Sequence, residues 1–216
     1  MKNKISFSKD ATDALLFKQL QRDVKKELNK IPASRIYLAQ FNALFYPLLF
    51  FVCYGLALLN SQNLALYYLL FVLMGIAMVL IFVNLVQKAV HEDIFPNRRF
   101  NRFLLYIFDL IGGNSYIWKK RHKNLHHKYP NISGWDSDIE QASLFKIYPH
   151  EKTKKLHTFQ PILIFVFYPI FLLNWLFVRD FKDFFKDSQL VRKICVIPTK
   201  EYIKLFIFKG LFIAYI

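Results

Sequence analysis

The stretch Phe41-Asn-Ala-Leu-Phe-Tyr-Pro-Leu-Leu-Phe-Phe-Val-Cys-Tyr-Gly-Leu-Ala-Leu-Leu59 contains no charged residue, and it is followed by the short polar segment Asn60-Ser-Gln-Asn63. A second uncharged stretch, Leu64–Val86, comes directly after that segment. Each stretch has the length of about 20 apolar residues that a helix needs to cross a bilayer. So short a connection predicts an antiparallel pair of membrane-spanning helices. The first stretch follows about forty residues of charged chain, so it is not a signal peptide.

The composition agrees with a membrane protein whose charged parts face the cytoplasm. The chain is 55% hydrophobic and 18% aromatic, yet its formal net charge is +15. No soluble recognition module is visible, which argues against a nucleic-acid-binding protein. The two cysteines, Cys53 and Cys195, provide neither a disulfide framework nor a cysteine-based zinc site. Glycine and proline are sparse and no repeat is visible, so residues 1–216 are interpreted as one domain.

The distribution of Lys and Arg predicts the orientation of the two spans. Residues 1–36 hold nine of these cations, residues 60–63 hold none, and residues 87–158 hold thirteen. Basic segments next to membrane spans stay in the cytoplasm. Both charged segments are therefore expected there, in a bacterium on the inner side of the cytoplasmic membrane.

The segment that follows, residues 118–140, reads WKKRHKNLHHKYPNISGWDSDIE and holds three of the six histidines of the chain. His122 and His126 share a helix face, and His127 lies at the edge of that face. Three imidazoles on one side of a helix pack poorly in a core and suit a metal ion. The alternative is a basic surface helix, which is consistent with the neighbouring cations Lys119, Lys120, Arg121, Lys123 and Lys128.

A fourth histidine, His91, lies one turn beyond the end of the second apolar stretch. A lone histidine at the end of a span is more often an interfacial residue than a ligand. Because His91 lies between the span and the triple-histidine segment, it is also interpreted as a metal ligand.

At this point the chain resembles the membrane fatty acid desaturases, in the branch that includes linoleoyl-CoA and front-end acyl desaturases. The resemblance extends from about Phe82 to Asp180 and needs no gap between Asn84 and Ile139. The residues that carry it are Asn84, Gln87-Lys-Ala-Val-His91, Asn101, Gly112-Gly-Asn-Ser115, Trp118, His122-Lys-Asn-Leu-His126-His127 and Asn131-Ile-Ser-Gly-Trp-Asp136-Ser-Asp138-Ile. A further stretch of similar spacing comprises His157-Thr-Phe-Gln160, Tyr168, Asn174-Trp175 and Asp180.

The resemblance implies an oxidoreductase with a di-iron centre on the cytoplasmic side, held by three histidine boxes. Such enzymes use O₂ and two electrons to introduce a double bond into a fatty acyl chain. Here the implied iron ligands are His91, His122, His126 and His127, and no other catalytic residue is expected. Residues expected to hydrogen-bond the ligands are Asn84, Asp136, Asp138 and His157, and those expected to line a substrate channel are Trp118 and Trp135.

The two carboxylates, Asp136 and Asp138, have a second interpretation as a solvated acidic loop. The acyl substrate is expected to be carried by CoA, a carrier protein or a lipid. Residues 1–216 show no cytochrome b5-like segment, so the electron donor is expected to be a separate protein of the ferredoxin or cytochrome b5 type. Membrane lipid is the other expected partner.

The chain departs from the family pattern in two ways. Gln87 replaces the leading histidine of the first box, so position 87 is either a weak oxygen ligand or a lost one, and Lys88 replaces an acidic residue. The third box is absent, and the terminal run Ile203–Ile216 has 14 residues, about 21 Å as a helix against a hydrocarbon core of about 30 Å. A truncated chain is therefore expected, which should not desaturate acyl chains by itself.

The uncharged run Phe159–Val178 is interrupted by Pro161, Pro169 and Asn174. If it crossed the bilayer, the basic segment 179–204 would lie outside, against the usual bias. The run is therefore expected to lie at the membrane interface.

The resulting prediction is an all-α integral membrane protein, with a transmembrane helical hairpin and a cytoplasmic helical region that carries the histidine boxes. Three alternatives remain open: a lipid or carotenoid hydroxylase with similar boxes, a non-catalytic membrane relative, and a haem protein with two histidine ligands. The haem interpretation explains neither the adjacent His126-His127 pair nor the Asp136-Ser-Asp138 motif.

Overall fold

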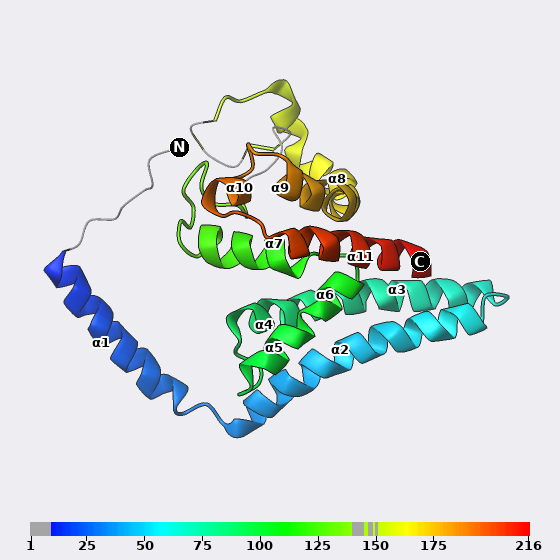
Figure 1. Cartoon of the computed structure of the whole chain (residues 1–216), viewed down its shortest axis with the longest axis horizontal. Helices are drawn as coiled ribbons and strands as arrows, with labels where there is room; N and C mark the ends of the chain where they lie inside the picture. Colours follow the sequence, from blue (N-terminus) through cyan, green and yellow to red (C-terminus); the bar gives the residue numbers. More distant parts are fainter. Residues whose placement is uncertain (1–9, 140–144, 147–148, 150) are drawn as a thin grey trace. The chain divides into compact units, whose positions relative to one another are not determined.

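A computed structural model describes residues 10–139, 145–146, 149 and 151–216, and every regular element in those residues is helical. The prediction of an all-α fold is confirmed. The chain divides into two compact units (Figure 1). We refer to Met1–Lys88 with Ile94–Pro96 as the hairpin unit, and to Ala89–Asp93 with Asn97–Ile216 as the histidine unit.

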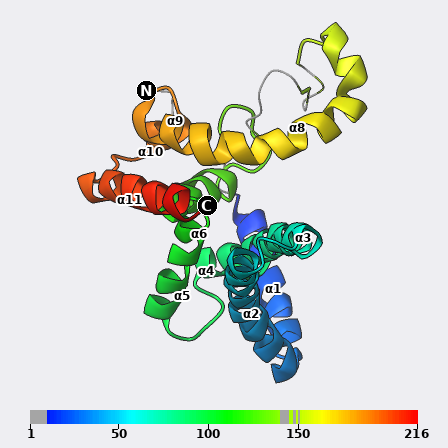
Figure 2. The same ribbon diagram turned by 90° about the vertical axis from the view of Figure 1, so that its right-hand side faces the viewer.

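The hairpin unit contains the two long apolar helices. Its elements are α1 (Ala11–Leu28), α2 (Ala33–Leu59), α3 (Leu64–Ile81), the π-helical turn η1 (Phe82–Val86) and the start of α4 (Gln87–His91). Helices α2 and α3 lie side by side, as Figures 1 and 2 show. In the turn between them, Asn60 Nδ2 donates to Leu56 O (2.8 Å) and Asn63 Oδ1 accepts from Leu66 N (3.1 Å). These bonds satisfy backbone groups at both helix ends, so the polar segment closes the predicted hairpin.

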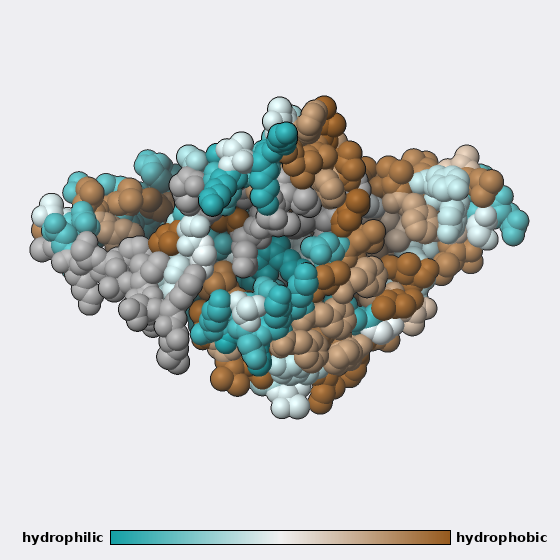
Figure 3. Space-filling model, turned by 90° about the horizontal axis from the view of Figure 1, so that it is seen from above, coloured by the Kyte–Doolittle hydropathy of each residue, from teal (hydrophilic) through white to brown (hydrophobic). Residues whose placement is uncertain are grey.

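The hairpin has the surface expected of a membrane protein. Ala43, Ala57 and Ala77 are buried, which lets the two backbones approach closely, as in other membrane helix pairs. Many larger apolar side chains of α2 and α3 are exposed. Figure 3 shows the surface of the molecule from above, with apolar residues in brown beside hydrophilic residues in teal. The continuous helices Ala33–Leu59 and Leu64–His91 are the two that are long and apolar enough to cross a membrane within the described residues.

The histidine unit is built from shorter helices around a separate core. Its later elements are α5 (Arg98–Leu104), α6 (Tyr106–Leu110), α7 (Ser115–Lys119), the π-helical η2 (Lys120–His126), the 3₁₀ turn η3 (Lys155–Phe159), α8 (Gln160–Asn174), the π-helical η4 (Trp175–Arg179), α9 (Asp180–Phe185), α10 (Leu190–Ile194) and α11 (Thr199–Tyr215). One buried cluster joins four of these elements, α7, η2, α9 and α10, to α11 through Ile117, Leu125, Phe184, Leu190, Val191, Ile197 and Leu205.

Helix α11 includes most of the apolar run Ile203–Ile216, and it packs against α6. Tyr106 and Phe208 stack at 5.7 Å between ring centroids, and Tyr215 Oη donates to Leu110 O (2.6 Å). The buried ammonium of Lys209 donates to three acceptors, Gly112 O at 2.5 Å, Leu176 O at 2.6 Å and Asp180 Oδ2 at 2.8 Å. All three of its protons are therefore used, as a buried cation requires.

Helix α8 contains the run that was expected to lie at the membrane interface. It has 15 residues and continues through η4 into α9. It is not one of the two candidate spans. The interfacial placement of residues 159–178 stays a prediction, which chemical labelling of Cys195 tests.

Candidate metal centre

His91 ends α4, at the point where the chain turns away from the long helix. The next residue, Glu92, has a positive φ of 64°, which stops the helix. Its carbonyl accepts a hydrogen bond from the buried Asn101 Nδ2 (2.9 Å). Its carboxylate lies near Arg102 (3.3 Å) and Lys119 (3.6 Å). These contacts fix the backbone directly after His91.

The other histidines come from η2, whose backbone is π-helical rather than α-helical. His127 N donates to His122 O (2.9 Å), a bond between residues five apart. The wider turns of a π-helix place residues four and five positions apart on neighbouring parts of one side. The rings of His122 and His126 are stacked, with centroids 5.7 Å apart, as the predicted shared face implies, and His127 also lies beside His122.

Three imidazoles converge through their Nε2 atoms. His122 Nε2 lies 3.2 Å from His91 Nε2 and 3.0 Å from His127 Nε2. Metal–nitrogen bonds of about 2.0–2.1 Å would put two ligand nitrogens roughly 2.9 Å apart at a right angle and roughly 3.4 Å apart at the tetrahedral angle. The observed separations fall within this range. Without a metal ion, three neutral rings cannot all hydrogen-bond one another through Nε2, since each Nε2 carries either one proton or one lone pair. The residues present fit a metal ion.

His126 belongs to a second group, together with Asp136 and Asp138. Its Nδ1 lies 3.0 Å from Asp136 Oδ1 and 3.1 Å from Oδ2. A carboxylate that accepts the Nδ1 proton fixes the tautomer in which Nε2 binds a metal. Asp138 Oδ2 lies 3.7 Å from His126 Nδ1 and 3.8 Å from His122 Nδ1, beyond direct hydrogen-bond distance.

The loop that carries these carboxylates is folded around Asp136. Asp136 Oδ2 accepts from Asn131 N (2.8 Å) and Asp136 Oδ1 accepts from Asp138 N (2.9 Å). Asn131 and Gly134 both have positive φ, 59° and 75°, which produces the tight turn. Asp136 is buried, so the alternative of a solvated acidic loop is wrong for this residue.

A buried guanidinium attaches this loop to the histidine helix. Arg121, directly before His122, donates to Ser137 O (2.6 Å) and to Asp183 Oδ2 (2.7 Å). Ser137 Oγ returns a bond to Arg121 O (3.2 Å), and Arg179 also donates to Ser137 O (2.8 Å). Sequence reasoning missed this connection. Arg121 looked like one of several surface cations, and no local pattern pairs it with a carboxylate sixty-two positions later.

The environment keeps these groups in the protonation states that metal ligation needs. Burial, together with the neighbouring His122 and His91, lowers the pKa of His127 and favours its neutral ring. Burial would raise the pKa of Asp138, but the nearby histidines and the Ser137 hydroxyl outweigh it, and the pKa lies below its usual value. Neutral imidazoles beside an ionised carboxylate are therefore favoured.

Trp118 and Trp135 were both expected to line a substrate channel. Trp118 is buried and stacks on His122, with centroids 5.0 Å apart and planes inclined by 16°. It also contacts Trp175 (5.7 Å). Trp135 packs on Tyr129 (4.9 Å). Trp118 thus lies directly behind a candidate ligand, and the channel itself stays a prediction.

Three further candidates lie as follows. Asn84 Nδ2 donates to Leu80 O (3.0 Å) within its own helix, and Gln87 is the half-buried first residue of α4. Their roles near a metal stay predictions. His157 lies in η3, where its Nδ1 accepts from Lys154 N (3.1 Å). It is in neither of the two groups that the described residues form.

The fold and site define an all-helical membrane protein with a histidine cluster that could hold a metal ion. Residues 63–213 match the family model of the fatty acid desaturases, and the chain belongs to that family. The match begins in the hairpin unit and extends through the histidine unit. The predicted family is confirmed.

Similar proteins include an sn-1 linoleoyl-lipid 6-desaturase of Synechocystis, 27% identical over 143 residues, which cover 66% of this chain and 40% of the relative. A protein of the same name from Arthrospira platensis is 36% identical over 83 residues, 35% of this chain and 23% of the relative. An acyl-lipid (8-3)-desaturase of Physcomitrium patens is 24% identical over 155 residues, 71% of this chain and 32% of the relative. The chain thus spans less than half the length of these relatives. No solved structure gives a significant match.

Proposed function

We propose that this chain carries iron-binding histidines of a membrane acyl desaturase, which introduces a double bond into a fatty acyl chain with O₂ and two electrons. The observation that supports the proposal best is the convergence of His91, His122 and His127, with Nε2 atoms 3.0 and 3.2 Å apart. The proposal is also supported by membership of the desaturase family.

The histidines divide between two iron ions in this proposal. His91, His122 and His127 hold one ion through Nε2. His126 binds the second ion, because Asp136 engages its Nδ1 and leaves Nε2 as the coordinating nitrogen. Four histidines, with Gln87 as a weak or lost fifth ligand, underfill two iron sites, so ligands beyond these five residues are expected.

Iron, when bound, supplies the oxidising power for cleaving C–H bonds at an unactivated carbon, which no side-chain acid or base provides. The chain's own residues orient the site and exclude water. Asp136 keeps the proton on His126 Nδ1, and the buried Trp118 covers one face of the His122 ring. Exclusion of water strengthens the electrostatic interactions within such a site.

The same proposal covers the substrate, the electron donor and the side of the membrane that the site faces. An acyl lipid is the proposed substrate, which agrees with the names of the lipid-acting relatives. Electrons come from a separate donor protein of the ferredoxin or cytochrome b5 type. The site faces the cytoplasm, since the basic segments on either side of the hairpin favour that side.

The iron content of the purified chain tests this function. His122→Ala should remove most of the bound iron, because His122 Nε2 contacts both partner nitrogens. The matched control is His157→Ala, which lies in neither histidine group and should retain iron. Gln87→His, one turn before His91 in α4, should raise the iron content. Equal iron in the wild type, His122→Ala and His157→Ala would contradict the proposal.

A further inference from the structure

Helix α1 has an exposed apolar face from Leu16 to Leu28. Leu16, Leu20, Val24 and Leu28 recur every four residues and lie on one side of the helix. Their exposed fractions are 66%, 57%, 48% and 57%. Phe17 adds an aromatic ring beside them. A stripe of this kind is unfavourable in water and marks a contact surface.

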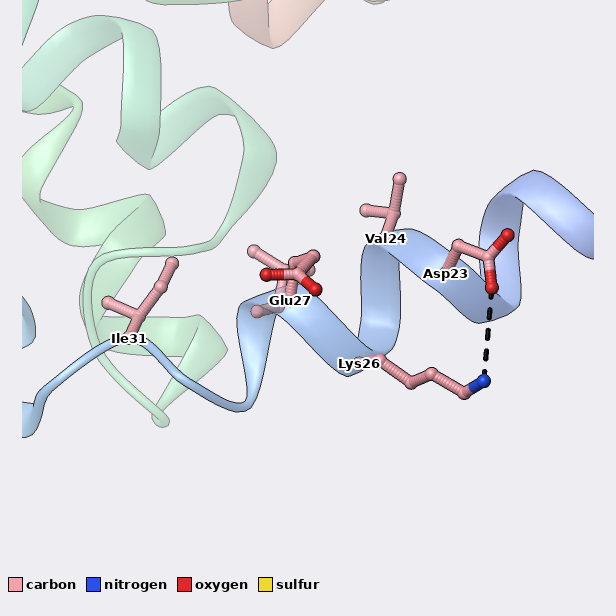
Figure 4. Close-up of a pocket in the computed structure, with 6 residues that line it drawn as sticks. Asp23, Val24, Lys26, Glu27 and Ile31 are labelled. Carbon is pink, nitrogen blue, oxygen red and sulfur yellow. Dashed lines mark ion pairs between the residues drawn. The ribbon is translucent and has the colours of Figure 1, made fainter.

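The opposite side of α1 is basic. At about 100° per residue, the centre of this side, opposite the apolar stripe, is occupied by Lys18, Arg22, Lys25 and Lys26. Figure 4 shows Val24 and Ile31 on one side of the helix and the Lys26 side chain on the other. They border a shallow hollow lined by Asp23, Val24, Lys26, Glu27, Leu28 and Ile31.

The exceptions to this division are few. Glu27 lies at the edge of the apolar stripe, but its carboxylate is paired with Lys30 Nζ at 2.6 Å. Asp23 is paired more loosely with Lys26, at 3.9 Å. Leu15 is the one large apolar residue of α1 on the basic side. The third carboxylate of α1, Asp13, lies in the first turn and precedes the apolar stripe, which begins at Leu16. All the Lys and Arg residues of α1 lie on the side opposite the stripe.

The chain holds α1 close to the bilayer. Only four residues, 29–32, separate Leu28 from the start of α2 at Ala33. Four residues extend at most about 14 Å, and the eight helical residues before the apolar run at Phe41 add about 12 Å. Exposed apolar side chains continue across this connection at Ile31, Ile36 and Leu38. The apolar face of α1 therefore leads directly into the surface of a candidate span.

We propose that α1 lies flat on the anionic leaflet of the membrane, with its apolar face among the acyl chains and its basic side chains at the level of the head groups. An apolar face opposite a basic face is typical of interfacial helices, and long basic side chains reach outward from such a position. Anionic lipid attracts these cations. A second copy of the chain fits less well, because its net charge is also +15. The proposal goes beyond the desaturase function, since α1 lies outside the matched residues 63–213.

Spin-label accessibility in lipid nanodiscs tests this placement. Cys53 and Cys195 are first replaced by serine, and a nitroxide is then attached to Leu20→Cys on the apolar face or to Arg22→Cys on the basic face. In anionic nanodiscs the label at position 20 should collide more with O₂, which concentrates in the acyl chains, and less with a water-soluble nickel chelate. The matched label at position 22 should show the reverse.

Each other outcome contradicts the proposal in a recognisable way. Equal nickel accessibility at positions 20 and 22 would place α1 in water. A label at position 20 that neither reagent reaches would mean that protein covers the face, either a second copy or another segment. The difference in reagent accessibility between positions 20 and 22 should be smaller in purely zwitterionic nanodiscs. If that difference were unchanged, anionic lipid would not contribute to the placement of α1.

Discussion

Asp136 orients the candidate ligand His126 through the Nδ1 atom of its ring. Its carboxylate is buried and accepts from Asn131 N, Asp138 N and His126 Nδ1. The two backbone bonds hold the loop, and the third bond holds the imidazole. Because one carboxylate does both, the orientation of His126 depends on the fold of residues 131–138.

Asp136→Asn should therefore weaken metal binding at His126. An amide can donate as well as accept, so it no longer fixes the Nδ1–H tautomer, and the loop loses a charged acceptor. We expect a loss of roughly 10- to 100-fold in metal affinity. Titration of the metal-free protein with Fe(II) measures the affinity. Asp138→Asn is the comparison and should cost less, since Asp138 lies 3.7 Å from His126 Nδ1. Equal losses in both variants would contradict this ranking.

Asp109 makes stability depend on pH. Burial raises its pKa to about 6, against the opposing hydrogen bonds from Ser115 N (2.7 Å) and Ser115 Oγ (2.6 Å). The unfolded value is about 3.9. Between these values the folded state binds more protons than the unfolded state, so stability falls as pH rises from about 4 to 6. Two pKa units correspond to at most about 3 kcal/mol.

Asp109→Asn should flatten this pH dependence, because an amide does not ionise. Thermal unfolding in detergent between pH 4 and pH 7 measures it. Part of the slope should remain, since burial also raises the pKa of Asp180 to about 6 although Lys209 opposes the shift. A variant with the slope of the wild type would show that Asp109 is not the group responsible.

Among the elements, the helical hairpin could be predicted from the sequence and the π-helix η2 could not. In a membrane, two long uncharged stretches must satisfy their backbone hydrogen bonds internally, and helices do so. The two stretches and the polar tetrad between them therefore predict the hairpin from the sequence alone. The register of η2 depends on a bond between His127 N and His122 O and on the packing of Leu125 in the core. A single extra residue in a helical turn leaves no sign in the spacing of histidines. The motif predicted a metal site, whereas the structure was needed to see which histidines lie together and which lies beside Asp136.

Helix α8 decides on which side of the membrane the segment 179–204 lies. An interfacial α8 keeps that segment, with seven Lys and Arg against four Asp and Glu, in the cytoplasm. Cys195 reports its position, because Cys53 is buried. In a bacterial host, a membrane-impermeant maleimide should label inside-out vesicles and not intact spheroplasts. Labelling of intact spheroplasts that Cys195→Ser abolishes would instead make residues 159–178 a third span.

Across the histidine unit, buried ion pairs join parts of the chain that are distant in sequence. Arg121 and Asp183 pair at 2.7 Å, and Lys209 and Asp180 pair at 2.8 Å. Both carboxylates come from α9, and Arg179 reaches Ser137 O from the preceding turn. The sequence showed these residues only as members of a basic, aromatic segment. Pairing across 62 positions, as for Arg121 and Asp183, or across 29, as for Lys209 and Asp180, depends on tertiary packing, which periodicity does not encode.

Removal of Arg121 alone should strongly destabilise the histidine unit. Arg121→Met leaves Asp183 buried without its partner, at an expected cost of about 3–5 kcal/mol. The double variant Arg121→Met with Asp183→Leu should recover much of that loss, because no charge is then stranded. Chemical unfolding in detergent compares the three proteins. A double variant no more stable than Arg121→Met would mean that the hydrogen bond from Arg121 to Ser137 O, rather than the charge pair, carries the effect.

The adjacent His126-His127 pair directs two rings from one helical turn toward two different groups of candidate ligands. In the present register, His127 stands beside His122 and His126 turns to Asp136. The two rings are inclined by 81° to each other, with centroids 5.6 Å apart. Insertion or deletion of one residue in η2 would move both rings at once, so neither histidine can replace the other. The doublet therefore makes both candidate groups depend on the length of a single turn.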